Sequence, residues 1–129
     1  MSDCLFCKIN KGGIPAEKVY DSDEVFAIKD INPQAPIHLL IIPKKHFSTV
    51  LEIQEEDHEL IGSIYSIANR LAKKNGLDQT GFRVVVNCGA EAGQSVFHLH
   101  YHLFLYPAIF QNIVDYQYHG HHVQQDVCI

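Results

Sequence analysis

The chain has 129 residues, of which 47% are hydrophobic and 19% are charged, and its formal net charge is −5. This length and composition predict a single soluble globular domain with one core. The acidic balance argues against duplex DNA and anionic membrane surfaces as partners, because both are bound through an excess of lysine and arginine. A small phosphate-bearing ligand fits, since histidine side chains and backbone amides suffice to bind one phosphate.

No part of the sequence has the pattern of a targeting or membrane-spanning segment. No basic segment followed by a long apolar run opens the chain, and apolar runs such as Leu39–Ile42 are far too short to cross a bilayer. We therefore expect a cytoplasmic protein without a membrane partner. In that compartment cysteines are thiols or metal ligands rather than disulfides. The chain has four of them, Cys4, Cys7, Cys88 and Cys128.

The first motif is a cysteine pair, Cys4 and Cys7, at the spacing of half a zinc site. The nine histidines of the chain offer the two further ligands that a structural zinc needs. Two alternatives stay open, a redox pair and a pair of inert buried thiols, although a redox pair normally follows a strand. Phe6 and Ile9 give the same segment an apolar side, so we expect a short helix that ends at Gly12.

Strands are predicted over residues 18–20 and 25–29, where the apolar pattern is interrupted by a turn-like Asp-Ser-Asp. Residues 30–36 contain two prolines and are expected to form a loop. Asp30 in this loop is read as a turn former, with ribose binding as the alternative. Residues 38–42 are nearly all apolar, which is typical of a central strand buried on both faces.

Residues 55–95 predict one long helix, a strand and a loop of small residues. Residues 55–75 have apolar residues at helical spacing, acidic residues first and lysines last, and Gly76 is a plausible stop. Residues 82–87 predict a strand, and residues 88–95 a loop whose glycines would let the backbone approach a ligand. Lys44 and Lys45 are interpreted as a solvated basic loop rather than as phosphate contacts.

Three histidines alternate with apolar residues over Phe97–Phe104. In a strand His98, His100 and His102 would stand in a row on one face, with Leu99, Tyr101 and Leu103 packed behind them. Imidazole can be a nucleophile, an acid or base, or a metal ligand near neutral pH. We therefore interpret this row as a site rather than as a solvated strand face.

The sequence changes character after this strand. Residues 106–129 begin with Tyr-Pro and end in a polar tail with a histidine cluster, His119, His121 and His122. A mobile polar tail is favoured over a metal site for this cluster.

These motifs resemble the histidine-triad superfamily, whose signature is His-φ-His-φ-His-φ-φ with φ apolar. The match over His98–Phe104 is closest to the nucleotide-binding HINT branch, in its bacterial form with an N-terminal Cys-x-x-Cys. Supporting segments occur in the family's order across roughly residues 4–105, namely Asp30–Pro36, His38–His46, Phe82–Asn87 and Gly93–His98.

The resemblance implies an α+β fold, in which a five-stranded antiparallel sheet carries one long and one short helix. It also implies a homodimer in which two sheets join into ten strands. Residues 1–105 would form the domain, and residues 106–129 a divergent C-terminal extension, because the Gly-Gly-Arg turn of relatives is missing.

The activity implied by the resemblance is hydrolysis of purine nucleoside 5′-phosphoramidates or aminoacyl-adenylates, through a nucleotidyl-histidine on His100. His38 would support the triad, and Ser95 would help the amine to leave. Asp30 would bind the ribose, which reverses the preference for a turn. The α-phosphate would contact His102, Asn87, Gln94 and Ser95. The base would pack against Phe6, Ile9, Ile31 and Leu40, with Ile28 where many relatives have phenylalanine.

The family also implies a closed structural zinc site and no organic cofactor. The zinc ligands would be Cys4, Cys7, His46 and His98. Three other functions stay open: a zinc-stabilised nucleotide-binding module with little turnover, a dinucleoside polyphosphate hydrolase, and a metallohydrolase with the triad as ligands. The sequence places no carboxylate near the triad, which speaks against the last of these.

Overall fold

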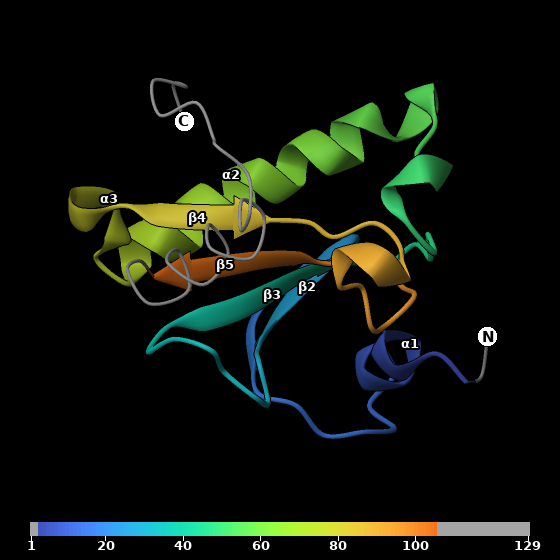
Figure 1. The fold of residues 1–129 in the computed structure, drawn as a ribbon, viewed down its shortest axis with the longest axis horizontal. Coiled ribbons are helices and arrows are strands. Elements are labelled where there is room, and N and C mark those ends of the chain that lie inside the picture. The colour runs from blue at the N-terminus through green and yellow to red at the C-terminus, as the bar shows by residue number, and fades with distance from the viewer. Residues whose placement is uncertain (1–2, 106–129) are drawn as a thin grey trace.

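The structure, a computed structural model, describes residues 3–105 (Figure 1). The predicted C-terminal extension, residues 106–129 with its histidine cluster and Cys128, lies outside the described residues. Among the helices of the described part, none combines the length and the apolar character needed to cross a membrane.

Five antiparallel strands form one sheet in the order β1-β2-β3-β5-β4, which confirms the predicted fold class. The strand predicted to be central, residues 38–42, is β3, and all of its residues are buried. The strands are β1 (Lys18–Asp21), β2 (Val25–Lys29), β3 (His38–Pro43), β4 (Phe82–Val85) and β5 (Tyr101–Leu105).

The two predicted helices lie on opposite faces of the sheet. The long helix, α2 (His58–Lys74), packs its apolar stripe over the alternate residues of β2, β3 and β5 that include Ala27 and Ile41. The short helix, α1 (Leu5–Asn10), packs over the intervening strand residues, such as Leu40, whose side chains lie on the opposite face of the sheet. Figure 1 shows α1 beside the orange segment that links β4 to β5. The alternation of side chains along each strand therefore divides the molecule into a core layer and a second layer under α1.

Several element boundaries differ from the sequence prediction; the strand predicted over residues 82–87, for example, ends at Val85. The helix predicted from residue 55 begins at His58, because Glu55–Asp57 form a 3-10 turn in which the Asp57 carboxylate accepts a hydrogen bond from the Gln54 amide. Beyond Gly76, whose φ of 76° is left-handed as the predicted helix stop requires, an unpredicted four-residue helix, α3 (Leu77–Thr80), follows.

The histidine strand is shorter than predicted, since β5 begins only at Tyr101. The preceding residues bond to the segment that follows β3 instead of joining a ladder: Leu99 N–H donates to the carbonyl of Phe47 at 2.7 Å. Alternation nevertheless persists, because Leu99 and Leu103 are buried in the core layer as predicted. His98 and His100 point to the other side, where the ring of Phe6 contacts both.

Candidate active site and metal centre

The predicted catalytic histidines gather on the face of the sheet that carries α1, where β3 and β5 run side by side. In the register of this strand pair, His38 lies opposite Phe104 and Leu40 opposite His102. The rings of His100 and His102 are 5.0 Å apart between centroids, and those of His38 and His102 are 5.2 Å apart. The structure therefore brings together three histidines that the sequence separates by as many as 64 positions.

His100 is held in a single neutral form. Its Nδ1 lies 2.8 Å from the carbonyl oxygen of His98, which can only accept a hydrogen bond, so Nδ1 carries the hydrogen. Burial lowers the pKa of His100 below its ordinary value, because the buried site disfavours the imidazolium. A neutral ring protonated at Nδ1 leaves the lone pair on Nε2, and this is the form in which imidazole is a nucleophile.

His102 is held in the opposite form by a chain of hydrogen bonds. The backbone N–H of Gln34 donates to Nδ1 of His38 at 3.1 Å, so neutral His38 carries its hydrogen on Nε2. That Nε2 lies 3.0 Å from Nδ1 of His102, which must accept. Burial lowers the pKa of His102 to about 3, so the ring is neutral and its own hydrogen is on Nε2. His100 thus presents a lone pair at its Nε2, whereas His102 presents a hydrogen-bond donor at its Nε2.

Asp30 forms the turn that its loop position predicts and also reaches the histidines. Its Oδ1 accepts the backbone N–H of Asn32 at 2.9 Å, an Asx turn. Its Oδ2 lies 3.2 Å from Nε2 of His38. The expectation that no carboxylate lies near the triad is therefore wrong. The loop folds back on itself, as the hydrogen bond from Asp30 N–H to the carbonyl of His38 shows, and spacing in the sequence does not reveal this.

Gln94 organises the loop before the triad. Its side chain is buried, and its Oε1 accepts the backbone N–H of Gly89 at 2.8 Å. Its Nε2 donates to the carbonyls of Ser48 and Val96 at 2.8 and 3.0 Å. Both amide hydrogens are thus used within the protein. Sequence reasoning missed this role, because the contact with Ser48 spans 46 positions.

The remaining predicted ligand contacts differ in exposure. Ser95 is exposed and Asn87 is half-buried, and both lie on the same loop. Gly93 lies beside the Asn87 side chain, since a Cβ atom added at Gly93 would be 3.8 Å from the Asn87 amide nitrogen. Ile31 is 77% exposed, so this large apolar side chain stands open to a ligand. The other predicted base contacts are buried in the layer under α1, and they are Phe6, Ile9 and Leu40.

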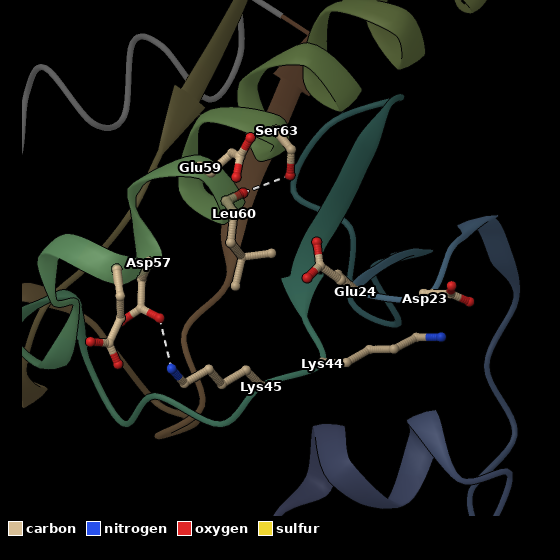
Figure 2. A pocket seen from close by; sticks show the side chains of 9 residues that line it. Asp23, Glu24, Lys44, Lys45, Asp57, Glu59, Leu60 and Ser63 are labelled. Atoms are coloured by element: carbon tan, nitrogen blue, oxygen red, sulfur yellow. Dashed lines mark hydrogen bonds and ion pairs between the residues drawn. The ribbon is translucent and has the colours of Figure 1, made fainter.

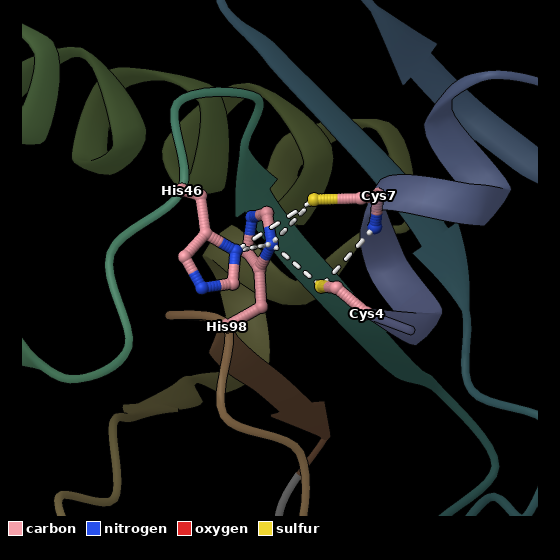
Figure 3. A group of neighbouring side chains, drawn as sticks. All are labelled: Cys4, Cys7, His46 and His98. Atoms are coloured by element: carbon pink, nitrogen blue, oxygen red, sulfur yellow. Dashed lines mark hydrogen bonds between the residues drawn. The ribbon is translucent and has the colours of Figure 1, made fainter. Parts of the chain in front are cut away.

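The predicted zinc ligands converge at the start of α1 (Figure 3). One donor atom from each of the four residues lies within 4.8 Å of all the others. Nδ1 of His98 is 3.2 Å from Sγ of Cys4, 3.6 Å from Sγ of Cys7 and 3.0 Å from Nδ1 of His46. Two sulfurs and two imidazole nitrogens are the donor set of a closed tetrahedral zinc site.

Two details of this cluster fit a metal cation. Nε2 of His98 lies 2.7 Å from the carbonyl of Pro43 and must donate to it, so Nδ1 presents its lone pair to the cluster. Burial, followed by the neighbouring Cys4, raises the pKa of the Cys7 thiol. Two adjacent thiolates repel each other without a cation between them, and a bound cation reverses this effect.

A second group of possible ligands, Asp30, His38 and His102, does not fit a metal. A metal here would need the lone pair of Nε2 on His38. The Gln34 amide occupies Nδ1 of that ring, which leaves the hydrogen on Nε2. This group is therefore suited to holding a proton.

The two lysines after β3 line a cavity of about 730 Å³ together with α2 residues such as Leu60 and Ser63 (Figure 2). Lys44 pairs with Asp21 at 2.8 Å and Lys45 with Asp57 at 2.7 Å. Lys45 is exposed and Lys44 is half-buried, so both lysines of this loop are held by carboxylates.

A family model and several relatives match most of this chain. The family model described as "Scavenger mRNA decapping enzyme C-term binding" matches residues 3–113. A protein named HitA from Neisseria gonorrhoeae is 45% identical over 103 residues, which cover 80% of this chain and 95% of the relative.

Two solved structures share the fold closely. A HIT family hydrolase from Legionella pneumophila Philadelphia 1 has a TM-score of 0.78 at 47% identity, covering 79% of this chain and 91% of that chain. A histidine triad nucleotide-binding protein from Candida albicans has a TM-score of 0.73 at 36% identity, covering 78% of this chain and 73% of the other.

Proposed function

The chain belongs to the HIT family, and from this premise we propose that it hydrolyses purine nucleoside 5′-phosphoramidates or aminoacyl-adenylates as a member of the HINT branch. The observation that carries the proposal is the hydrogen bond from Nδ1 of His100 to the carbonyl of His98, which leaves Nε2 as a nucleophile. A HIT family hydrolase and a histidine triad nucleotide-binding protein among its structural relatives support a nucleotide as substrate.

The reaction proceeds in two displacements at phosphorus. Nε2 of His100 attacks, a nitrogen–phosphorus bond to the protein forms, and the bond from phosphorus to the amine breaks. The Ser95 hydroxyl gives the leaving amine its proton. Water then attacks the nucleotidyl-histidine, its proton returns to Ser95, and the electron pair of the breaking bond returns to His100. Covalent catalysis of this kind divides one difficult displacement into two easier ones.

The surrounding residues bind and orient the substrate. The Nε2 hydrogen of His102 donates to a phosphate oxygen, where donors offset the growing charge. His38 holds His102 in this form. Asp30 binds the ribose, and the exposed Ile31 covers the base above the apolar layer under α1. Asn87 and Ser95 contact the α-phosphate. Gln94, whose amide is committed to backbone groups, serves the phosphate by shaping the loop.

The metal cluster supports the fold. Cys4, Cys7, His46 and His98 would hold zinc as a structural ion that joins α1 to the segment before β5. No organic cofactor takes part. We further propose a homodimer with a ten-stranded sheet, and the cytoplasm stays the predicted compartment.

A single-turnover assay with adenosine 5′-phosphoramidate tests the proposal. The wild type should release AMP and form an adenylated protein that can be trapped by acid quench. His100→Ala should do neither and should keep the native fold, as far-UV circular dichroism would show. His58→Ala, which removes an exposed histidine at the start of α2, is the matched control and should react like the wild type.

Other outcomes separate the remaining functions. Near-full turnover by His100→Ala would contradict the proposed nucleophile. If the wild type binds AMP but produces none from the phosphoramidate, the protein is a nucleotide-binding module. Faster cleavage of diadenosine polyphosphate than of the phosphoramidate would identify a dinucleoside polyphosphate hydrolase.

A further inference from the structure

One hydrogen atom in the site faces two acceptors. Nε2–H of His38 lies between Oδ2 of Asp30 at 3.2 Å and Nδ1 of His102 at 3.0 Å. We propose that Asp30 is a positioning residue that couples sugar binding to the donor strength of His102. The vicinal hydroxyls of a ribose would occupy Oδ2 and leave the His38 hydrogen entirely to His102. This inference rests on the proposed function for its substrate, and it adds a route from the sugar to the reacting phosphate.

The loop fixes every other partner in this arrangement. The Gln34 amide occupies Nδ1 of His38, so His38 has only one hydrogen to share. Oδ1 of Asp30 is held by the Asn32 amide, which leaves Oδ2 as the oxygen that can change partner. The side chain of Asp30 is 20% exposed and that of His38 only 3%, so a ligand can reach the carboxylate without reaching the ring.

The consequence for His102 follows from the cooperativity of hydrogen bonds. While Oδ2 attracts the His38 hydrogen, the hydrogen bond to Nδ1 of His102 is shared and weak. Once the sugar occupies Oδ2, a full hydrogen bond into Nδ1 withdraws electron density from the ring of His102. The Nε2 hydrogen of His102 then becomes a stronger donor to the phosphate. Binding of the ribose should therefore increase kcat and not only lower KM.

The first test does not depend on hydrolysis. Ring-nitrogen NMR of 15N-histidine-labelled protein is recorded with adenosine and with 2′,3′-dideoxyadenosine, each at saturation. Adenosine should shift the Nδ1 resonance of His102 in the direction of a stronger accepted hydrogen bond, and the dideoxynucleoside should not. Asp30→Asn, whose amide oxygen can still accept the Asn32 hydrogen bond, should abolish the difference. Asp30→Ser keeps an acceptor at the same turn and serves as the second variant. Asp23→Asn, an exposed acid in the β1–β2 turn, is the control.

The second test separates kcat from KM with adenosine 5′-phosphoramidate and its 2′,3′-dideoxy analogue. Loss of both hydroxyls should lower kcat of the wild type by about tenfold, which corresponds to one hydrogen bond of about 1.4 kcal/mol. In Asp30→Asn the two substrates should have equal kcat.

Equal resonance shifts from both nucleosides, an unchanged response in Asp30→Asn, or no binding of adenosine would overturn the inference. If the sugar-dependent shift occurs but no phosphoramidate is hydrolysed, the coupling stands and the proposed activity fails.

Discussion

The carbonyl oxygen of His98 accepts the Nδ1 hydrogen of His100 at 2.8 Å, so the backbone of one histidine sets the protonated nitrogen of the next. The side chain of the same His98 points its Nδ1 to Cys4 and Cys7 at the start of α1. Position 98 therefore joins the proposed metal site to the proposed nucleophile through a single residue. Any change that moves His98 should act on both stability and catalysis.

Metal removal is expected to destabilise the protein. The purified chain should bind one zinc per protomer, released by a thiol reagent and counted with a chromogenic chelator. Cys4→Ser and Cys7→Ser should lose the zinc, and their Tm should fall by roughly 4 °C for each kcal/mol of lost stability. Cys88→Ser, which alters a half-buried cysteine outside the cluster, is the matched control. An unchanged Tm after complete zinc removal would contradict a structural role.

Phe6 is expected to contribute both to the stability of the protein and to catalysis. Its ring lies edge-on to His98 and His100, with centroids 5.9 and 5.0 Å away, and the residue is 3% exposed. Phe6→Ala should lower the free energy of unfolding by about 3–5 kcal/mol, because a buried aromatic ring leaves a cavity. It should also lower kcat, since His100 loses a packing neighbour. The comparison is Leu5→Ala on the same helix, 40% exposed, with an expected cost of about 0.5 kcal/mol in urea unfolding.

Substitution of Gln94 tests whether its amide is structural. Gln94→Ala would leave an N–H and two carbonyls without their partner, which should cost about 1–3 kcal/mol of stability. Gln94→Glu keeps the acceptor but faces two carbonyl oxygens with a carboxylate, so it should be destabilised as well. The exposed Gln79→Ala should unfold at the wild-type urea concentration. If Gln94→Glu were as stable as the wild type, the two donated bonds would contribute nothing.

The pH dependence of stability should reflect the burial of His102. Its pKa is about 3 in the folded protein, against 6.5 ordinarily, because burial disfavours the imidazolium. Between these values the unfolded chain binds a proton that the folded chain does not, so stability is lost as the pH falls below about 6.5. Burial also lowers the pKa of His38, which adds to the same trend.

The measurement is the urea midpoint at pH 7 and pH 5. His102→Gln should show a smaller decrease than the wild type over this interval, and exposed His58→Gln should show the wild-type decrease. Because all three proteins keep the metal ligands, the difference between them reports on His102 together with the His38 ring bonded to it. A decrease in His102→Gln as large as that of the wild type would assign the pH dependence to other groups.

Much of the fold was readable from local pattern. The alternation over Phe97–Phe104 assigned Leu99 and Leu103 to the core and the histidines to the opposite side, and the structure confirms this. The apolar run at residues 38–42 predicted the central strand. Such patterns succeed because the face on which a side chain lies follows from the period of the backbone.

What only the tertiary structure decided is the protonation pattern of the site. The sequence supplied the histidines, but the folded backbone places their hydrogens: the Gln34 N–H acts through His38 on His102, which is 64 positions beyond His38, and the carbonyl of His98 acts on His100. Which nitrogen carries a proton depends on how the loop before β3 folds, on the turn of the backbone at His98 and on the register of β3 with β5, rather than on local composition. The same reason explains why neither the contact from Asp30 to His38 nor the bond from Gln94 to Ser48 could be predicted from the sequence.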